Sequence, residues 1–88
     1  MAVYSSERPL YPRQLAERCG NVVKEATWRA WQCRARNHMP YVRQGCSNRP
    51  HRATYPSVAD AMLKYEMGVA TYDEVEQAAR RVLDGALQ

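Results

Sequence analysis

Cysteine and histidine occur in two pairs with the same spacing, and these side chains are the ones best suited to metal binding or nucleophilic catalysis. Four residues separate Cys33 from His38, and four separate Cys46 from His51. Zinc prefers thiolate and imidazole ligands. Structural zinc sites usually contain two closely spaced cysteines, however, and no such pair is present, although the third cysteine, Cys19, lies nearby in the sequence. We therefore expect no metal or other cofactor, and we interpret the thiols as reduced and either buried or incidental.

An enzyme is not indicated either. Cys46 and His51 can be drawn as a nucleophile and a base, but any chain with three cysteines and two histidines supplies such a pair. The sequence has no nucleophile elbow, phosphate-binding loop or cluster of carboxylates with metal-ligand spacing. We expect a protein that works by binding rather than by catalysis.

Arginine is the distinctive residue of the sequence. Residues 1–52 contain ten basic side chains, nine of them arginine, and three acidic ones, which gives this part a net charge of +7. Residues 53–88 contain three basic and six acidic side chains and carry a net charge of −3. Because a guanidinium presents a rigid fork of donors that matches phosphate and the guanine edge, this asymmetry predicts a polyanionic partner, double-stranded DNA.

The length of 88 residues indicates one small domain spanning residues 1–88. No apolar run approaches the ~20 residues that a membrane-spanning helix requires, and the first residues lack the apolar core of a secretion signal. We therefore expect a cytoplasmic protein of a bacterial cell, associated with the nucleoid and without a membrane partner. Residues 1–10 show no periodicity, which predicts a flexible arm or a short edge strand.

Two helices separated by a short turn are predicted in the basic half. Pro12 suits the first position of a helix over 12–19, and Gly20 suits the position after its end. A second helix is predicted over about 24–36, after a turn at 21–23. Its apolar residues recur at helical spacing, which favours packing in the core over base stacking by exposed rings. These apolar residues are Trp28, Trp31 and Ala35.

A hairpin and two further helices are predicted in the remaining chain, with strands beginning at 41–42 and 53–55 and helices over 58–67 and 71–83. Each helix follows a hydroxyl residue with an acid three positions later, the pattern of a capping box, and precedes a glycine expected to end it. These residues are Ser57, Asp60 and Gly68 for one helix, and Thr71, Glu74 and Gly85 for the other. The predicted fold is mainly α with a small β-hairpin, in the order helix-helix-hairpin-helix-helix, with a C-terminal helical segment at 71–88.

Two groups of polar residues are the candidate DNA contacts. The outward face of the second helix is predicted to enter the major groove, where Arg29 could fork onto a guanine edge. The arginine-rich hairpin is predicted to reach a minor groove. The helix residues are Lys24, Glu25, Thr27, Arg29, Gln32, Arg34 and Arg36, and the hairpin residues are Arg43, Arg49, His51 and Arg52. Two alternatives without a role in DNA binding remain open, namely that the polar helix face is only solvated and that the hairpin tip is a solvated loop.

Four stretches of the sequence resemble a known family. They are Gln14–Gly20, Val23–Trp31, Met39–Arg43 and Arg52–Tyr55. Together they resemble the MerR-like winged helix-turn-helix proteins, and within these the small phage excisionases, or recombination directionality factors, and related prophage regulators. The resemblance covers roughly residues 11–67 and rests on short motifs.

The resemblance implies that the second helix lies in the major groove and that the hairpin acts as a wing at the adjacent minor groove. It also implies that several protomers bind side by side and bend the DNA, so that an integrase excises rather than integrates. The sequence departs from the family pattern by a longer turn at 21–22, by Lys24 in place of a small capping residue, and by Trp28 in place of a smaller aliphatic residue. The longer turn could rotate the second helix.

Two other functions remain open at this point. A phage or prophage transcriptional regulator would use the same DNA-binding surface. A small phage-encoded inhibitor would instead dock its acidic last helix, over 71–83, onto a host protein. That helix suits equally well a role in covering the core or in self-association.

Overall fold

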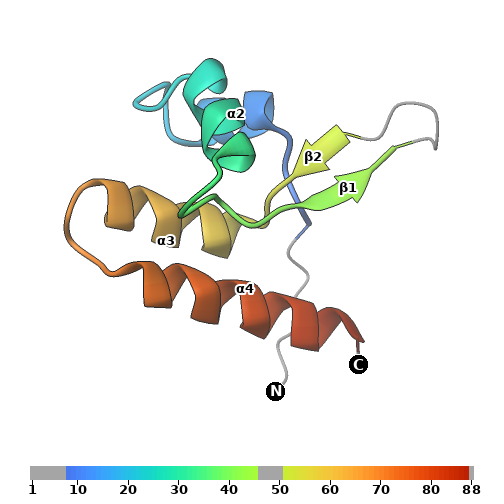
Figure 1. Cartoon of the computed structure of the whole chain (residues 1–88). Helices are drawn as coiled ribbons and strands as arrows, with labels where there is room; N and C mark the ends of the chain where they lie inside the picture. The colour runs from blue at the N-terminus through green and yellow to red at the C-terminus, as the bar shows by residue number, and fades with distance from the viewer. Residues whose placement is uncertain (1–7, 46–50, 88) are drawn as a thin grey trace.

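The computed structural model describes residues 8–45 and 51–87, with the side chains of the last helix described as far as residue 82. This part of the chain forms four helices and one hairpin (Figure 1). Their bounds are α1 Pro12–Arg18, α2 Glu25–Cys33, β1 Val42–Gln44, β2 His51–Ala53, α3 Pro56–Glu66 and α4 Tyr72–Leu87. The predicted mainly α class and the predicted order of elements are confirmed.

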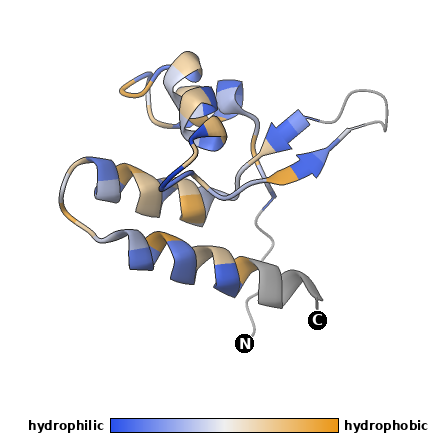
Figure 2. Ribbon diagram, viewed as in Figure 1, coloured by the Kyte–Doolittle hydropathy of each residue, from blue (hydrophilic) through white to orange (hydrophobic). Residues whose placement is uncertain are grey.

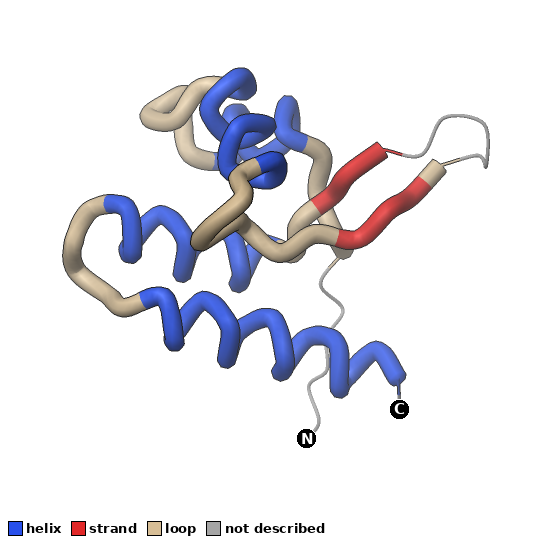
Figure 3. Tube along the Cα trace, in the orientation of Figure 1, coloured by secondary structure: helices blue, strands red, loops and turns tan. Residues whose placement is uncertain are grey.

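Helix α3 lies in the middle of the molecule, with the α1–α2 pair on one side and α4 on the other (Figures 1 and 3). Apolar side chains of all four helices meet between these layers, and the hairpin and the outer side of α4 are mostly hydrophilic (Figure 2). The buried cluster consists of Leu15, Ala16, Val23, Trp28, Trp31, Met39, Val58, Ala59, Met62, Val75, Ala78 and Val82. None of the described helices is both long enough and apolar enough to span a lipid bilayer.

The two tryptophans of α2 pack in this core, as the sequence predicts. Their rings meet edge to face with centroids 5.0 Å apart, and the exposed fractions of Trp28 and Trp31 are 2% and 6%. The indole N–H of Trp28 donates a hydrogen bond to the carbonyl of Val23 (3.1 Å), so its polar atom is satisfied inside the core. Base stacking on exposed tryptophan rings is therefore excluded.

The turn between α1 and α2 begins with two residues in the left-handed conformation. Gly20 has φ +67° and Asn21 has φ +64°, the region that glycine and asparagine adopt most readily. The amide of Asn21 donates to the carbonyl of Ala16 (2.8 Å), which satisfies a carbonyl at the end of α1. Gly20 therefore ends α1 as expected.

Helix α2 ends at Cys33, three residues before the predicted end at Arg36. Arg34 is extended, and the backbone reverses so that the amide of Met39 donates to the carbonyl of Trp31 (2.8 Å). This reversal buries the Met39 side chain completely. The prediction that Ala35 packs in the core was wrong, because Ala35 lies in the exposed loop beyond the helix.

The hairpin pairs β1 with β2 in antiparallel register, with Arg43 opposite Arg52 and Gln44 opposite His51. One more pair extends it, since the backbones of Leu10 and Thr54 exchange hydrogen bonds of 2.8 and 2.9 Å. Of the predicted arm, Leu10 thus behaves as an edge-strand residue, and residues 1–7 lie outside the described part. This pairing holds the start of α1 beside the hairpin.

Two capping predictions for the later helices were wrong. Helix α3 begins at Pro56 with Tyr55 as its N-cap, so Ser57 lies inside the helix, and Asp60 binds Arg18 of α1 at 2.6 Å instead of completing a capping box. Pro at the first helical position favours the earlier start. Helix α4 continues through Gly85, because glycine in a helix costs only about 1 kcal/mol relative to alanine.

The other capping predictions were confirmed. The backbone amide of Thr71 donates to the carboxylate of Glu74 (3.1 Å), which satisfies a donor at the start of α4. Gly68 follows the C-cap of α3 with φ +78° and allows the chain to turn toward α4.

A buried hydrogen-bond chain joins α2 to the hairpin. The side-chain amide of Gln32 donates to the hydroxyl of Thr54 (3.1 Å) and to the carbonyl of Arg52 (3.5 Å), and the hydroxyl of Thr54 donates to the carbonyl of Pro40 (3.1 Å). The exposed fraction of Gln32 is 4% and that of Thr54 is zero. The prediction that Gln32 lies on the outward face of the helix was wrong, because these partners draw its amide inward.

We predict that Gln32→Ala lowers the free energy of unfolding by about 1–3 kcal/mol, because it removes the donor to Thr54 and leaves a space between α2 and the hairpin. Urea unfolding followed by tryptophan fluorescence measures this change. The matched control is Gln77→Ala on the exposed side of α4, which should change the free energy by less than about 0.5 kcal/mol. Equal effects of the two substitutions would contradict a structural role for the Gln32 amide.

Candidate nucleic-acid interface

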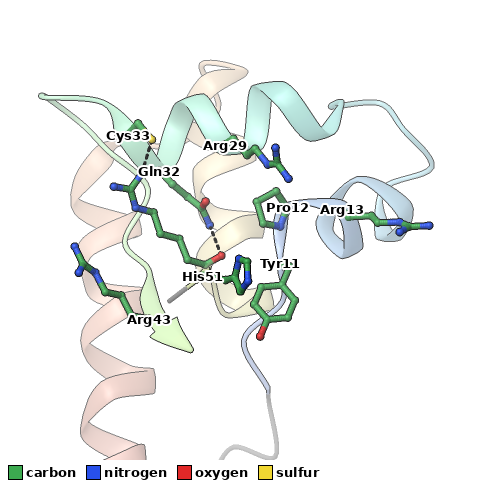
Figure 4. Close-up of a pocket in the computed structure, with 9 residues that line it drawn as sticks. Tyr11, Pro12, Arg13, Arg29, Gln32, Cys33, Arg43 and His51 are labelled. Atoms are coloured by element: carbon green, nitrogen blue, oxygen red, sulfur yellow. Dashed lines mark hydrogen bonds between the residues drawn. The ribbon is translucent and has the colours of Figure 1, made fainter. Parts of the chain in front are cut away.

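A concave surface with a volume of about 700 Å³ lies between the start of α1, the outer side of α2 and the hairpin (Figure 4). These segments are distant in the sequence, and the Leu10–Thr54 pairing and the Gln32 amide bring them together. We call this surface the arginine groove. It is lined by Tyr11, Pro12, Arg13, Arg29, Gln32, Cys33, Arg43, His51 and Arg52.

The arginine groove is cationic. Four of its residues are arginine and a fifth is histidine, and no carboxylate is among the described residues that line it. Like charges in one concavity repel one another, and an anion in the groove would remove that repulsion. The geometry therefore suits a phosphate-bearing ligand.

Three of the groove's arginines belong to the predicted DNA-contacting set, and His51 does too. Arg29 comes from α2, Arg43 from β1 and Arg52 from β2. The guanidinium of Arg52 lies 5.1 Å from the ring centroid of Tyr41 and contacts the sulfur of Cys33. The aromatic and thiol contacts orient this guanidinium without neutralising it.

The start of α1 supplies groove residues that the sequence did not predict. The Tyr11 ring meets the His51 ring edge to face, with centroids 5.8 Å apart, and Arg13 lies two residues further on (Figure 4). The residues predicted to contact DNA lie on the second helix and the hairpin, and none was predicted at the start of α1. The Leu10–Thr54 pairing places Tyr11 and Arg13 beside the hairpin, and no local sequence pattern predicts this pairing.

Arg29 is the groove residue at the centre of the exposed side of α2. Its Nη2 lies 2.6 Å from Oε2 of Glu25, one helical turn earlier, and 66% of its side chain is exposed. Lys24 and Thr27 are exposed at the N-terminal end of α2, as predicted, but they do not line the groove. Helix α2 therefore presents an exposed polar surface that continues from the groove toward its N-terminus.

Arg34 lies away from this surface. Its guanidinium forks onto Glu66 of α3 with hydrogen bonds of 2.5 and 3.2 Å, and it lies 5.7 Å from the Trp31 ring centroid. The hydrogen bond that Arg34 donates to Glu66 raises the pKa of Arg34 above its ordinary value, against partial desolvation. The prediction that Arg34 belongs to the exposed helix face was wrong, because it serves to fasten the end of α2 to α3. Arg36 is exposed in the following loop rather than on the helix.

The cysteine and histidine pairs are not gathered into a metal site in the described part, which contains no group of three or more metal-ligating side chains. Cys46 and Arg49 lie outside the described residues. Cys19 is half-buried and its sulfur accepts a hydrogen bond from the amide of Val23 (3.5 Å). Cys33 is exposed and lines the arginine groove.

Comparisons with known proteins give no relative for this chain. No protein-family model matches the sequence, and neither a curated protein nor a solved structure matches it. The functional conclusion therefore depends on the geometry of the site and on the residues that carry the resemblance to excisionases.

We predict that a bulky maleimide on Cys33 lowers the affinity for a duplex DNA by about tenfold, because the adduct fills the groove beside Arg52. Gel-shift titration of the alkylated protein measures the loss, and mass spectrometry identifies the modified thiol. Cys33→Ser is the control: it should bind DNA as the unmodified protein does, and any change in its binding after the same treatment reports modification of Cys19 or Cys46 instead. Unchanged binding after complete modification of Cys33 would show that the groove does not contact DNA.

Proposed function

We propose that the protein binds double-stranded DNA as a winged helix-turn-helix protein, with α2 as the recognition helix and the β1–β2 hairpin as the wing. The observation that carries the proposal is the convergence of four arginines and a histidine from three segments into a groove with no carboxylate among its described lining residues. A major groove is wide enough to admit one helix, and arginine is the residue that most often contacts its guanine edges.

The two parts of the surface suit different parts of the duplex. Arg29 and Thr27 on the exposed side of α2 have the polarity needed for base edges. Arg43, His51 and Arg52 on the hairpin suit phosphates or a narrow minor groove, where the negative potential is enhanced. The Gln32 amide holds the helix and the hairpin in one fixed relation, so both can engage neighbouring stretches of DNA without rearrangement.

The distribution of charge supports one binding face. Helix α4 lies across α3 from α2 (Figure 1), and exposed acidic side chains begin it, namely Asp73, Glu74 and Glu76. A molecule with cationic and anionic sides is oriented by the field of a polyanion before contact. The proposal therefore directs the arginine groove, and not α4, toward the DNA.

Within this function we propose an excisionase of a phage or other mobile element, acting in the cytoplasm on the nucleoid. The four stretches that resemble the small phage excisionases support this narrower assignment. In that role the protein bends DNA, self-associates along it and directs an integrase toward excision. A prophage transcriptional regulator is the alternative that uses the same surface.

A host-protein inhibitor receives less support. The apolar side chains of α4, Val75, Ala78 and Val82, are already buried in the core, so the stripe that would dock a partner helix is occupied. The outer side of α4 carries exposed acidic residues in its first turns and then exposed Arg80 and Arg81, and such a charged helix face is commonly just solvated.

We predict that Arg43→Gln weakens binding to all duplex sequences and lowers the slope of log K against log salt concentration by about 1, because it removes one phosphate contact. Gel-shift or anisotropy titration at several salt concentrations measures both effects. Arg80→Gln on α4 is the charge-matched control and should leave the slope unchanged. If both variants shift the slope equally, net charge rather than the groove governs binding.

We predict, for the excisionase assignment, that the protein protects the arms of a phage attachment site and bends them. Footprinting on attachment-site and promoter fragments of the same element, together with gel mobility of circularly permuted fragments, measures protection and bending. Protection of the promoter alone, without bending, would instead support the transcriptional regulator.

A further inference from the structure

The ion pair between Glu25 and Arg29 lies on the side of α2 that the proposed function directs into the major groove. The two side chains are one helical turn apart, their charged atoms are 2.6 Å apart, and the exposed fractions are 39% for Glu25 and 66% for Arg29. Figure 4 shows Arg29 at the edge of the arginine groove. A carboxylate at this position is unusual for a surface that contacts a polyanion, because phosphates repel it.

The presence of Glu25 is accounted for if its carboxylate meets a base rather than a phosphate. The donors in the major groove are the amino groups of cytosine and adenine, and cytosine N4 is the one that Glu accepts from. The guanidinium of Arg29 has five N–H donors, so donating to Glu25 leaves others free to fork onto a second partner.

The pair also has a definite donor and acceptor order. Across one G·C base pair the major groove presents two acceptors on guanine, N7 and O6, followed by one donor, N4 of cytosine. Arg29 with Glu25 presents two donors followed by an acceptor, which is the complement of this order. An A·T pair presents acceptor, donor, acceptor and then a methyl group. An Arg29 donor would therefore face the donor of adenine, or the Glu25 acceptor would face an acceptor.

The spacing matches as well. Guanine O6 and cytosine N4 are hydrogen-bonded to each other in the base pair, and are therefore about 3 Å apart. The charged atoms of Arg29 and Glu25 are 2.6 Å apart, so the guanidinium and the carboxylate can contact guanine O6 and cytosine N4 at the same time. The ion pair fixes both rotamers in advance and removes much of the ordering cost of binding.

We propose that Glu25 and Arg29 act together as a reader of one G·C base pair, with Arg29 on guanine O6 and N7 and Glu25 on cytosine N4. This inference deepens the proposed DNA-binding function and rests on it. Glu25 is then a specificity-determining residue that disfavours other base pairs at this position, in addition to its role at the first turn of α2.

The test is selection of binding sites from a randomised duplex library by the wild-type protein and two variants, Glu25→Ala and Arg29→Lys. The wild-type protein should enrich one G·C pair over A·T by about tenfold or more. Glu25→Ala should reduce that preference to a few-fold or less, because no acceptor for cytosine N4 remains, while general affinity is kept or increased, because a repulsive charge is removed. Arg29→Lys should lose the preference as well, because a lysine cannot fork.

The matched control is Glu17→Ala on α1. Glu17 is the partner of Arg13 in another exposed pair of the same spacing, with Nε and Oε1 3.6 Å apart. This variant removes the same charge beside another groove arginine, so it should change general affinity without changing the enriched sequence. Thermal melting of all variants followed by circular dichroism establishes that each remains folded.

The outcomes separate the inference from the function on which it rests. If Glu25→Ala enriches the same sequences as the wild-type protein and Glu17→Ala, the ion pair only stabilises the helix and the reader assignment is overturned. If the wild-type protein binds no duplex at all, the proposed function fails and the reader assignment fails with it. A loss of G·C preference confined to the α2 variants supports both.

Discussion

The burial of Trp28 and Trp31 sets the rotation of α2 about its axis, and the placement of the candidate DNA-contacting side chains on α2 depends on it. With both indoles in the core between α2 and α3, Glu25 and Arg29 must lie on the opposite side, in water. Gln32 lies one turn beyond Trp28 and at the boundary, where it meets the hairpin. A rotation of α2 by one residue position would bury a charge and expose an indole, so packing specifies this orientation strongly.

Arginines of the basic half divide into two uses. Arg18 binds Asp60 and Arg34 binds Glu66, so both fasten the α1–α2 pair to α3. Exposed ion pairs contribute little stability individually, and their main consequence here is placement of charge. They bring the acidic groups of α3 to the seams with α1 and α2, away from the groove, which collects arginines without a lining carboxylate among the described residues.

Local signals predicted the elements well, whereas contacts between distant segments decided the site. Pro12 and Gly20 act within a few residues of the helix end that each defines, and their predicted roles were confirmed. The position of Arg34 after α2 depends on Glu66, 32 residues further along the chain, and the burial of Gln32 depends on Thr54, 22 residues further along. Nothing in the neighbourhood of Gln32 distinguishes an inward amide from an outward one. For the same reason the sequence did not predict Tyr11 as a groove residue, because Tyr11 reaches the groove through the pairing of Leu10 with Thr54, directly after β2.

A groove of this kind links the stability of the domain to its ligand. Arg43 and Arg52 face each other across the hairpin, and their mutual repulsion opposes the fold until an anion is present. A domain of 88 residues has a small core with which to offset such repulsion. Any polyanion that binds only the folded state stabilises it in proportion to the logarithm of its concentration over the dissociation constant. If the proposed function holds, binding of DNA at these arginines therefore stabilises the folded domain.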